Sequence, residues 1–283
     1  MSAPDQRVPF SYARLALIAG NTFLEAVRQK LFNLMLLLAV GLVASVQAFR
    51  AFNFGSSELK FIFDYGLGAL VFFGSALTVT ATAQLFFSEI ESRTALTLLA
   101  KPVWRTEFIF GKLLGVWAVV GVFCALVTGL LIGLIAYREH ALMAANPEMF
   151  TGAGRPVPYG DIVIVGVLQW LKFGVLAAAT LLIASFSNTN LYTVIVGFFV
   201  LVICHLQYIA VEAYAHLTSL PLRVLVATLS HVFPNFQVFN LAEQIGPDSG
   251  VDGLVALRVA AYALTYIFVL GGLAVYSFRQ REI

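Results

Sequence analysis

Six long apolar segments separated by polar stretches constrain the fold of this chain more than any other feature of its sequence. A helix needs about 20 residues to cross a hydrocarbon core of roughly 30 Å, and each segment approaches or exceeds that length. The segments are 31–49, 65–87, 113–137, 162–186, 191–208 and 259–278. Only 11% of the 283 residues are charged, less than half the share in an ordinary soluble protein. We therefore predict an all-α membrane protein with six transmembrane helices.

Both termini are predicted to lie on the cytoplasmic side. An even number of spans returns the chain to the side on which it starts, and lysine and arginine are enriched in cytoplasmic loops. The termini and the loops on their side contain Arg7, Arg14, Arg28, Lys30, Arg93, Lys101, Arg105, Lys112, Arg279 and Arg281, whereas the opposite side contains Arg50, Lys60, Arg138, Arg155, Arg223 and Arg258. The excess on the side of the termini indicates that this side faces the cytoplasm.

The segment 88–112, between the second and third spans, is unusually rich in charge. Its charged residues are Glu89, Glu91, Arg93, Lys101, Arg105, Glu107 and Lys112. Because the neighbouring spans carry almost no charge, we expect this segment to lie in water at the membrane surface.

Local patterns within this segment predict two short helices joined by a corner. Ser88 and Glu91 have the spacing of a capping box, and Glu89 can pair with Arg93 one helical turn later. The Lys101-Pro102 dipeptide should end the first helix, because proline lacks an N–H and disfavours helical geometry in the residue before it.

The N-terminal segment 1–30 is predicted to contain a helix that lies in the plane of the membrane interface. From about Arg7 onward, apolar residues recur at helical spacing, while Arg14, Asn21, Glu25 and Arg28 gather on the opposite face. The alternative is a basic flank that only orients the first span.

Lys172 is the most informative charge within a predicted span. At about 1.5 Å per residue, its position lies roughly 16 Å beyond Asp161, near the middle of the membrane. A charge at that depth costs at least about 2.5 kcal/mol, so we expect Lys172 and its neighbour Gln169 to face a protein interior or a wet cavity. A structural role and a place on a transport path both remain open.

The segment 209–256 is predicted to lie outside the membrane on the side opposite the termini. Its apolar part, 220–233, is shorter than a span and has Pro221 at one end and Pro234 at the other. We interpret it as a partly re-entrant helix, because a seventh span would move the C-terminal arginines to the external side.

Several kinds of chemistry have no signature in this sequence. It contains no H-E-x-x-H and no G-x-x-x-x-G-K-[ST] pattern, so we predict no P-loop ATP hydrolysis and no cofactor in this chain. The net charge of +2 does not suggest nucleic-acid binding. His205, Glu212, His216 and His231 match no usual spacing of metal ligands, and no metal site is predicted.

Three parts of the sequence resemble ABC-2 type permeases, the membrane subunits of ATP-driven transporters. The similarity covers about 13–283 and is closest to the group that contains the nitrous-oxide-reductase maturation permease. One part resembles the cytosolic segment between the second and third spans of that family. Its matching residues are Glu89, Glu91, 94–99, Lys101-Pro102, Arg105, Phe108 and Gly111-Lys112. A second part, with Asn21-Thr22, Glu25, Arg28 and Lys30, resembles the N-terminal elbow helix of the family. A third part, with Pro234-Asn235-Phe236 and Phe239-Asn240, resembles the family's external segment before its last span.

This resemblance implies a type V exporter-like permease fold in the cytoplasmic membrane of a bacterium. It implies a separate ABC ATPase subunit that binds ATP and Mg²⁺, and a second permease copy or a related permease. The segment 88–112 would act as a coupling helix that docks on the ATPase. The residues implied for docking are Glu89, Glu91, Arg93, Lys101, Pro102, Trp104 and Arg105, with Arg14, Glu25 and Arg28 in support.

Two other functions remain open at the level of sequence. A membrane scaffold could pass ATPase-driven motion to a periplasmic partner, which would suit the sizeable external segments. An enzyme that works within the membrane or at the external face is the weaker alternative. If the chain is a transporter, Lys172 and Gln169 are the candidates for lining its transport path. Under each of these functions we expect the six spans to contact membrane lipid.

Overall fold

The computed structural model describes residues 10–49, 58–91, 104–145, 158–214, 219, 221, 223–224, 226, 232–245 and 250–280. The α-helices are α1 (Tyr12–Arg28), α2 (Lys30–Phe49), α3 (Glu58–Glu91), α5 (Arg105–Ala145), α6 (Tyr159–Phe186), α7 (Asn190–Tyr214) and α9 (Gly253–Arg279). Two short 3-10 helices, η2 (Phe236–Phe239) and η3 (Leu241–Gln244), precede α9. No strand occurs within these ranges, which confirms the predicted all-α class.

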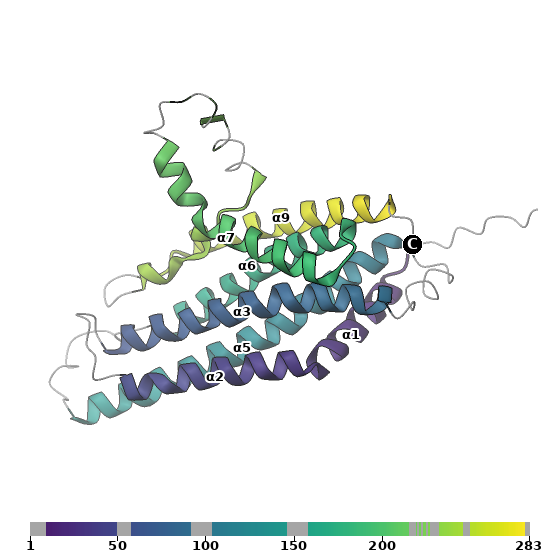
Figure 1. Cartoon of the computed structure of the whole chain (residues 1–283). Helices are drawn as coiled ribbons and strands as arrows, with labels where there is room; N and C mark the ends of the chain where they lie inside the picture. Colours follow the sequence, from purple (N-terminus) through teal and green to yellow (C-terminus); the bar gives the residue numbers. More distant parts are fainter. Residues whose placement is uncertain are drawn as a thin grey trace, which may run out of the picture.

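The helices from α2 to α9 confirm the six predicted spans, because all 6 are long and apolar enough to cross a membrane. They run side by side in a bundle, while α1 bends across one end of it near the C-terminus (Figure 1). We call this the α1 end and the other the far end. The centre of the bundle is α6, which packs against α3, α5, α7 and α9.

Several spans extend well beyond their predicted limits. At the far end, α3 begins at Glu58 and α5 continues to Ala145, so Arg138 lies on a helix rather than in the loop expected there. Its guanidinium pairs with Glu58 at 2.6 Å and joins these two extensions. Paired charges can thus prolong an apolar helix past the length that hydropathy alone indicates.

The predicted helical corner at 88–112 is wrong at its first edge, whereas its second helix begins close to the expected start near Thr106 and runs into the next span. Ser88 lies inside α3, which continues without interruption to Glu91, so Ser88 does not cap a new helix. Its hydroxyl donates instead to the carbonyl of Leu85 and to Glu25. The other helix of the pair is the start of α5, whose first residue is Arg105. Arg93, Lys101 and Pro102 lie outside the described residues.

Close packing of α1 against α5 depends on two glycines of α5. A Cβ on Gly111 would lie 2.7 Å from Ile18 of α1, and a Cβ on Gly115 would lie 2.5 Å from Thr22. Glycines four residues apart allow helix backbones to approach closely inside a membrane. The inner face of α1 thus packs on the bundle, and its place in the plane of the membrane interface stays a prediction.

A pair of tryptophans joins α5 to α6. The rings of Trp117 and Trp170 stack with their centroids 4.6 Å apart. Trp117 Nε1 donates to the carbonyl of Trp170 at 3.1 Å, and Trp170 Nε1 donates to the carbonyl of Trp117 at 2.8 Å. Stacking combined with hydrogen bonds in both directions fixes the register of the two helices.

At the far end, the two 3-10 helices η2 and η3 pack onto the bundle. In η2, Phe236 and Phe239 are buried, and this helix contacts α6 and α7. The helix α7 extends through Tyr214 and α9 begins at Gly253, so both spans enter the range expected to be external. Most of 220–233, including the predicted re-entrant helix, lies outside the described residues.

Candidate functional site

Two arrangements of polar side chains stand out, one at the α1 end and one in the middle of the bundle. The first, which we call the α1-end cluster, contains Arg14, Glu25, Glu89, Glu107 and Lys112. Its centre is Glu107, whose side chain is completely buried. Arg14 donates to both carboxylate oxygens of Glu107, from Nη2 at 2.8 Å and from Nε at 3.0 Å. This bidentate pair links α1 to the beginning of α5.

Backbone groups complete the environment of the Glu107 carboxylate. The N–H of Ser11 donates to Oε1 at 2.7 Å, and the N–H of Trp104 donates to Oε2 at 3.2 Å. Both N–H groups lie at the starts of helices, where no carbonyl of the same helix can accept them. The hydrogen bond to Glu107 raises the pKa of Arg14 above its usual value, so the Arg14 guanidinium is charged at physiological pH.

A second ion pair of the α1-end cluster joins α3 to α5. Lys112 is 1% exposed, and its ammonium lies 2.6 Å from Glu89. The same ammonium donates to the carbonyl of Leu85 at 2.9 Å and lies 4.0 Å from Glu25 of α1. Glu25 also accepts a hydrogen bond from Ser88 at 3.0 Å. Glu89 therefore pairs with Lys112 across two helices.

Arg105 connects the start of α5 to the end of α9. Its Nη1 donates to the carbonyls of Phe278 and Arg279 at 2.9 and 2.7 Å, and its guanidinium lies over the Phe278 ring. Carbonyls in the last turn of a helix lack partners within that helix and attract cations. Arg105 supplies such a cation, so four of the helices meet in one bonded unit at the α1 end.

The residues implied for ATPase docking are thus placed in different settings. Glu89, Arg105 and Arg14 contact neighbouring helices, whereas Arg28 is exposed and Trp104 is 39% exposed. Glu91 is the last residue of α3. Arg93, Lys101 and Pro102 lie outside the described residues, so their contacts are not defined here.

Sequence reasoning missed the buried parts of this cluster, Glu107 and Lys112. We expected both in water because they sit in a charged stretch beside a span. The signal that could have found them is the G-x-x-x-G spacing of Gly111 and Gly115. Small residues at that spacing indicate a close helix contact, and Lys112 lies within it.

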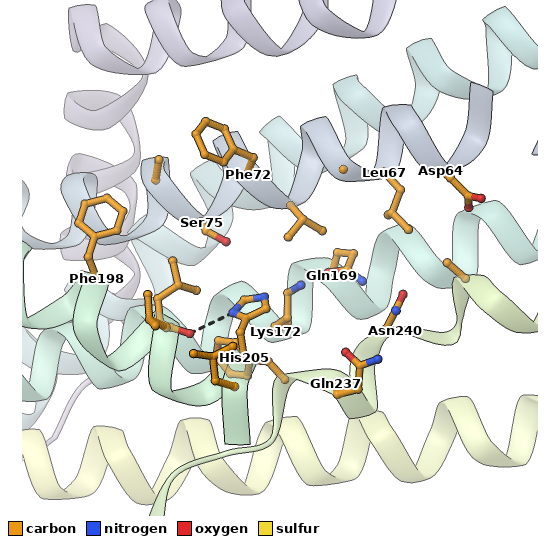
Figure 2. A pocket seen from close by; sticks show the side chains of 18 of the residues that line it. Asp64, Leu67, Phe72, Ser75, Gln169, Lys172, Phe198, His205, Gln237 and Asn240 are labelled. Atoms are coloured by element: carbon orange, nitrogen blue, oxygen red, sulfur yellow. Dashed lines mark hydrogen bonds between the residues drawn. The ribbon is translucent and has the colours of Figure 1, made fainter. Parts of the chain in front are cut away.

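The second arrangement is a cavity of about 870 Å³ in the middle of the bundle, which we call the central cavity. It is lined by α3, α6, α7 and the segment of η2 and η3 and is open at one side of the bundle (Figure 2). Lys172 and Gln169 line it from α6, with only 4% and 1% of their surfaces exposed. The Lys172 side chain points into the space between Gln169 and His205 (Figure 2).

Other polar groups of the central cavity have defined partners. Gln169 Nε2 donates to the carbonyl of Phe239 at 3.2 Å, and His205 Nδ1 contacts the carbonyl of Leu201 at 3.0 Å. Near the far end, Lys60 pairs with Asp64 at 3.2 Å. Asp64 lies within α3, about one and a half turns after the first residue of that helix.

The comparisons with known proteins support a transport function. A search of the curated proteins finds no match to this chain. A family model described as ABC-2 family transporter protein matches residues 13–283. This match confirms the resemblance to ABC-2 permeases, while the closer relation to the nitrous-oxide-reductase group stays a prediction. With its six apolar helices, the chain therefore belongs to the ABC-2 family of transporter proteins and is a multi-pass membrane component of an ABC transporter.

Proposed function

We propose that this chain is the permease subunit of an ATP-driven exporter in a bacterial cytoplasmic membrane. Family membership implies an ABC ATPase as its partner. In this proposal the α1 end faces the cytoplasm, and motion of the ATPase enters the bundle there. The ATP and Mg²⁺ that drive the cycle bind to the partner subunit.

The observation that carries this proposal is the α1-end cluster. Two ion pairs, Arg14–Glu107 and Lys112–Glu89, bind α1, α3 and α5 together with one partner of each pair buried. These bonds flank the segment 92–103, at which the ATPase would dock. A force applied there would reach α3, and α3 forms one wall of the central cavity. Rigid coupling of this kind converts a displacement in water into helix movement in lipid.

Within this proposal the docking residues divide into two groups. Glu91, Arg93, Lys101, Pro102 and Trp104 contact the ATPase directly, with exposed Arg28 beside them. Glu89, Arg105, Arg14 and Glu25 act through their bonds to neighbouring helices. Lys172 and Gln169 line the transport path, and a second copy of the permease, or a related permease, completes the path on the open side between α3 and α7.

The proposal is tested by purifying the chain together with an ABC ATPase and measuring ATP hydrolysis in proteoliposomes. Trp104→Ala should reduce the amount of ATPase that copurifies without lowering the thermal stability of the permease. Tyr137→Ala is a matched control, because it removes an aromatic side chain that is 65% exposed and lies toward the far end of α5, whereas Trp104 directly precedes α5 at the α1 end.

Three results would contradict parts of this proposal. If no ABC ATPase copurifies with the wild type, the coupling is wrong. If Trp104→Ala and Tyr137→Ala retain equal amounts of ATPase, the docking surface is wrong. If ATP hydrolysis is coupled but no compound crosses the vesicle membrane, the chain passes force to a periplasmic partner instead of exporting a substrate.

A further inference from the structure

The central cavity contains buried polar atoms that no described residue satisfies. Lys172 Nζ lines this cavity and makes no hydrogen bond or ion pair with any residue that the structure describes; it lies 5.5 Å from the centre of the Phe173 ring. Gln169 Oε1 and Ser75 Oγ are likewise buried without a partner among the described residues. A buried polar group without a partner normally costs free energy, so these two atoms beside the Lys172 ammonium indicate that the cavity can bind a polar ligand group.

The charged residues of the cavity wall favour a ligand with a negative charge. The charged residues that line it are Lys60, Asp64 and Lys172, and the first two pair with each other at 3.2 Å. Their charges cancel, so among the described residues Lys172 is the group that can place an uncompensated positive charge beside a bound anion. His205, on the facing helix α7, can add to this charge but cannot oppose it. An anion near Lys172 would gain a charge-assisted hydrogen bond in a medium of low dielectric constant.

The rest of the cavity wall is mostly apolar and favours a ligand that also has an apolar part. Phe72, Phe198, Val202 and Leu206 line the cavity from α3 and α7. Phe72 is 69% exposed and Leu206 is 51% exposed, so this wall is accessible from the side of the bundle. A small hydrated anion would leave these surfaces without a partner, whereas a chain or ring system would cover them.

We propose that the central cavity binds an anionic amphiphile, with its carboxylate, phosphate or sulfate group at Lys172 and its apolar body against α3 and α7. Ser75 Oγ can donate a hydrogen bond to the anion, and Gln169 Oε1 can accept one from a protonated oxygen of the same headgroup. This assignment rests on the proposed transport function, since it names the class of compound that the permease carries.

The test measures binding to the purified full chain in nanodiscs of phosphatidylcholine, without ATPase or nucleotide. Radiolabelled dodecyl phosphate should bind saturably to the wild type. Lys172→Met should weaken this binding by about 10- to 100-fold, the size expected for the loss of one charged hydrogen bond, and Lys172→Arg should restore most of it. Lys30→Met is the matched control, because Lys30 is an exposed lysine at the α1 end.

Competition by other compounds tests separately whether binding needs the anionic group and the apolar part of the ligand. Inorganic phosphate and dodecyltrimethylammonium should each compete at least about tenfold less well than unlabelled dodecyl phosphate. Equal competition by inorganic phosphate would overturn the apolar half of the assignment, and equal competition by the cationic amphiphile would overturn the anionic half. Equal binding by wild type and Lys172→Met would place the ligand elsewhere.

A measurement on the wild type covers the case in which Lys172→Met does not fold. An apolar amine-acylating reagent should modify Lys172 more slowly when dodecyl phosphate is present, while the modification of Lys30 stays unchanged, as read by peptide mass spectrometry. The absence of protection would overturn the assignment. Because no ATPase takes part, these results stand whether or not ATP coupling is found, and the two proposals can fail separately.

Discussion

Gly115→Ala should loosen the contact between α1 and α5, although it adds only one methyl group. The new Cβ would lie 2.5 Å from Thr22 Cβ and 2.7 Å from the backbone carbonyl oxygen of Ala19. Carbon atoms pack at about 3.5–4.0 Å, so α1 must move outward by about 1 Å. A backbone atom cannot turn away as the end of a side chain can. Overpacking of this kind costs about 1–3 kcal/mol.

Gly129→Ala on the same helix provides the matched control. A Cβ on Gly129 would meet nothing within 4 Å. Replacing glycine by alanine inside a helix contributes about 1 kcal/mol of helix propensity at either position, so this term cancels when the two variants are compared. The difference in the free energy of unfolding should therefore equal the cost of the contact alone, about 1–3 kcal/mol in favour of Gly129→Ala.

The assay is equilibrium unfolding of the purified chain in mixed micelles with an increasing fraction of SDS. The same variants should differ in ATP hydrolysis by the reconstituted complex, because an outward shift of α1 pulls on the pair formed by Arg14 and Glu107. Equal free energies of unfolding for Gly115→Ala and Gly129→Ala would refute the tight packing of α1 on α5. The α1-end cluster would then lose its mechanical role.

Three further predictions test other contacts of the bundle. Lys112→Met should lower the free energy of unfolding by about 1.5–3 kcal/mol, and a double-mutant cycle with Glu89→Gln should assign most of this loss to the pair; additive effects would contradict the pairing. Trp117→Phe and Trp170→Phe each remove a hydrogen bond between α5 and α6, so each should cost about 1 kcal/mol, and unchanged thermal stability would count against this junction. In intact cells, a membrane-impermeant thiol reagent should not label Trp104→Cys until the membrane is permeabilised, and labelling of intact cells would place the α1 end outside.

The spans were predictable from sequence because the membrane imposes one requirement on every residue in them. Satisfying the backbone in lipid requires a helix, and hydropathy then locates it. The helix ends were less predictable. Hydropathy ends the third span at Tyr137, yet α5 continues to Ala145 because Arg138 finds a partner on α3. Whether a charge ends a helix depends on a partner that the local sequence does not contain.

Some residues of the candidate sites were likewise predictable from sequence, and others were not. Lys172 was found from sequence because an isolated charge within an apolar span is costly wherever its partner lies. The pair formed by Arg14 and Glu107 was missed because its members are 93 residues apart. Local rules pair charges within one helical turn, so they could suggest Arg93 for Glu89 but not Lys112, which pairs with Glu89 from another helix.

Two buried lysines of this chain therefore have opposite meanings for stability and function. Lys112 has a carboxylate and a carbonyl within 3 Å, so replacing it by methionine removes bonds that hold the fold. Lys172 has no such partner among the described residues, and a buried amine without one costs free energy in the folded state. Lys172→Met should thus stabilise the ligand-free protein by about 1 kcal/mol or more, in the same SDS titration in which Lys112→Met destabilises it. A loss of stability in both variants would show that Lys172 supports the fold, and its place in the cavity would no longer indicate a binding role.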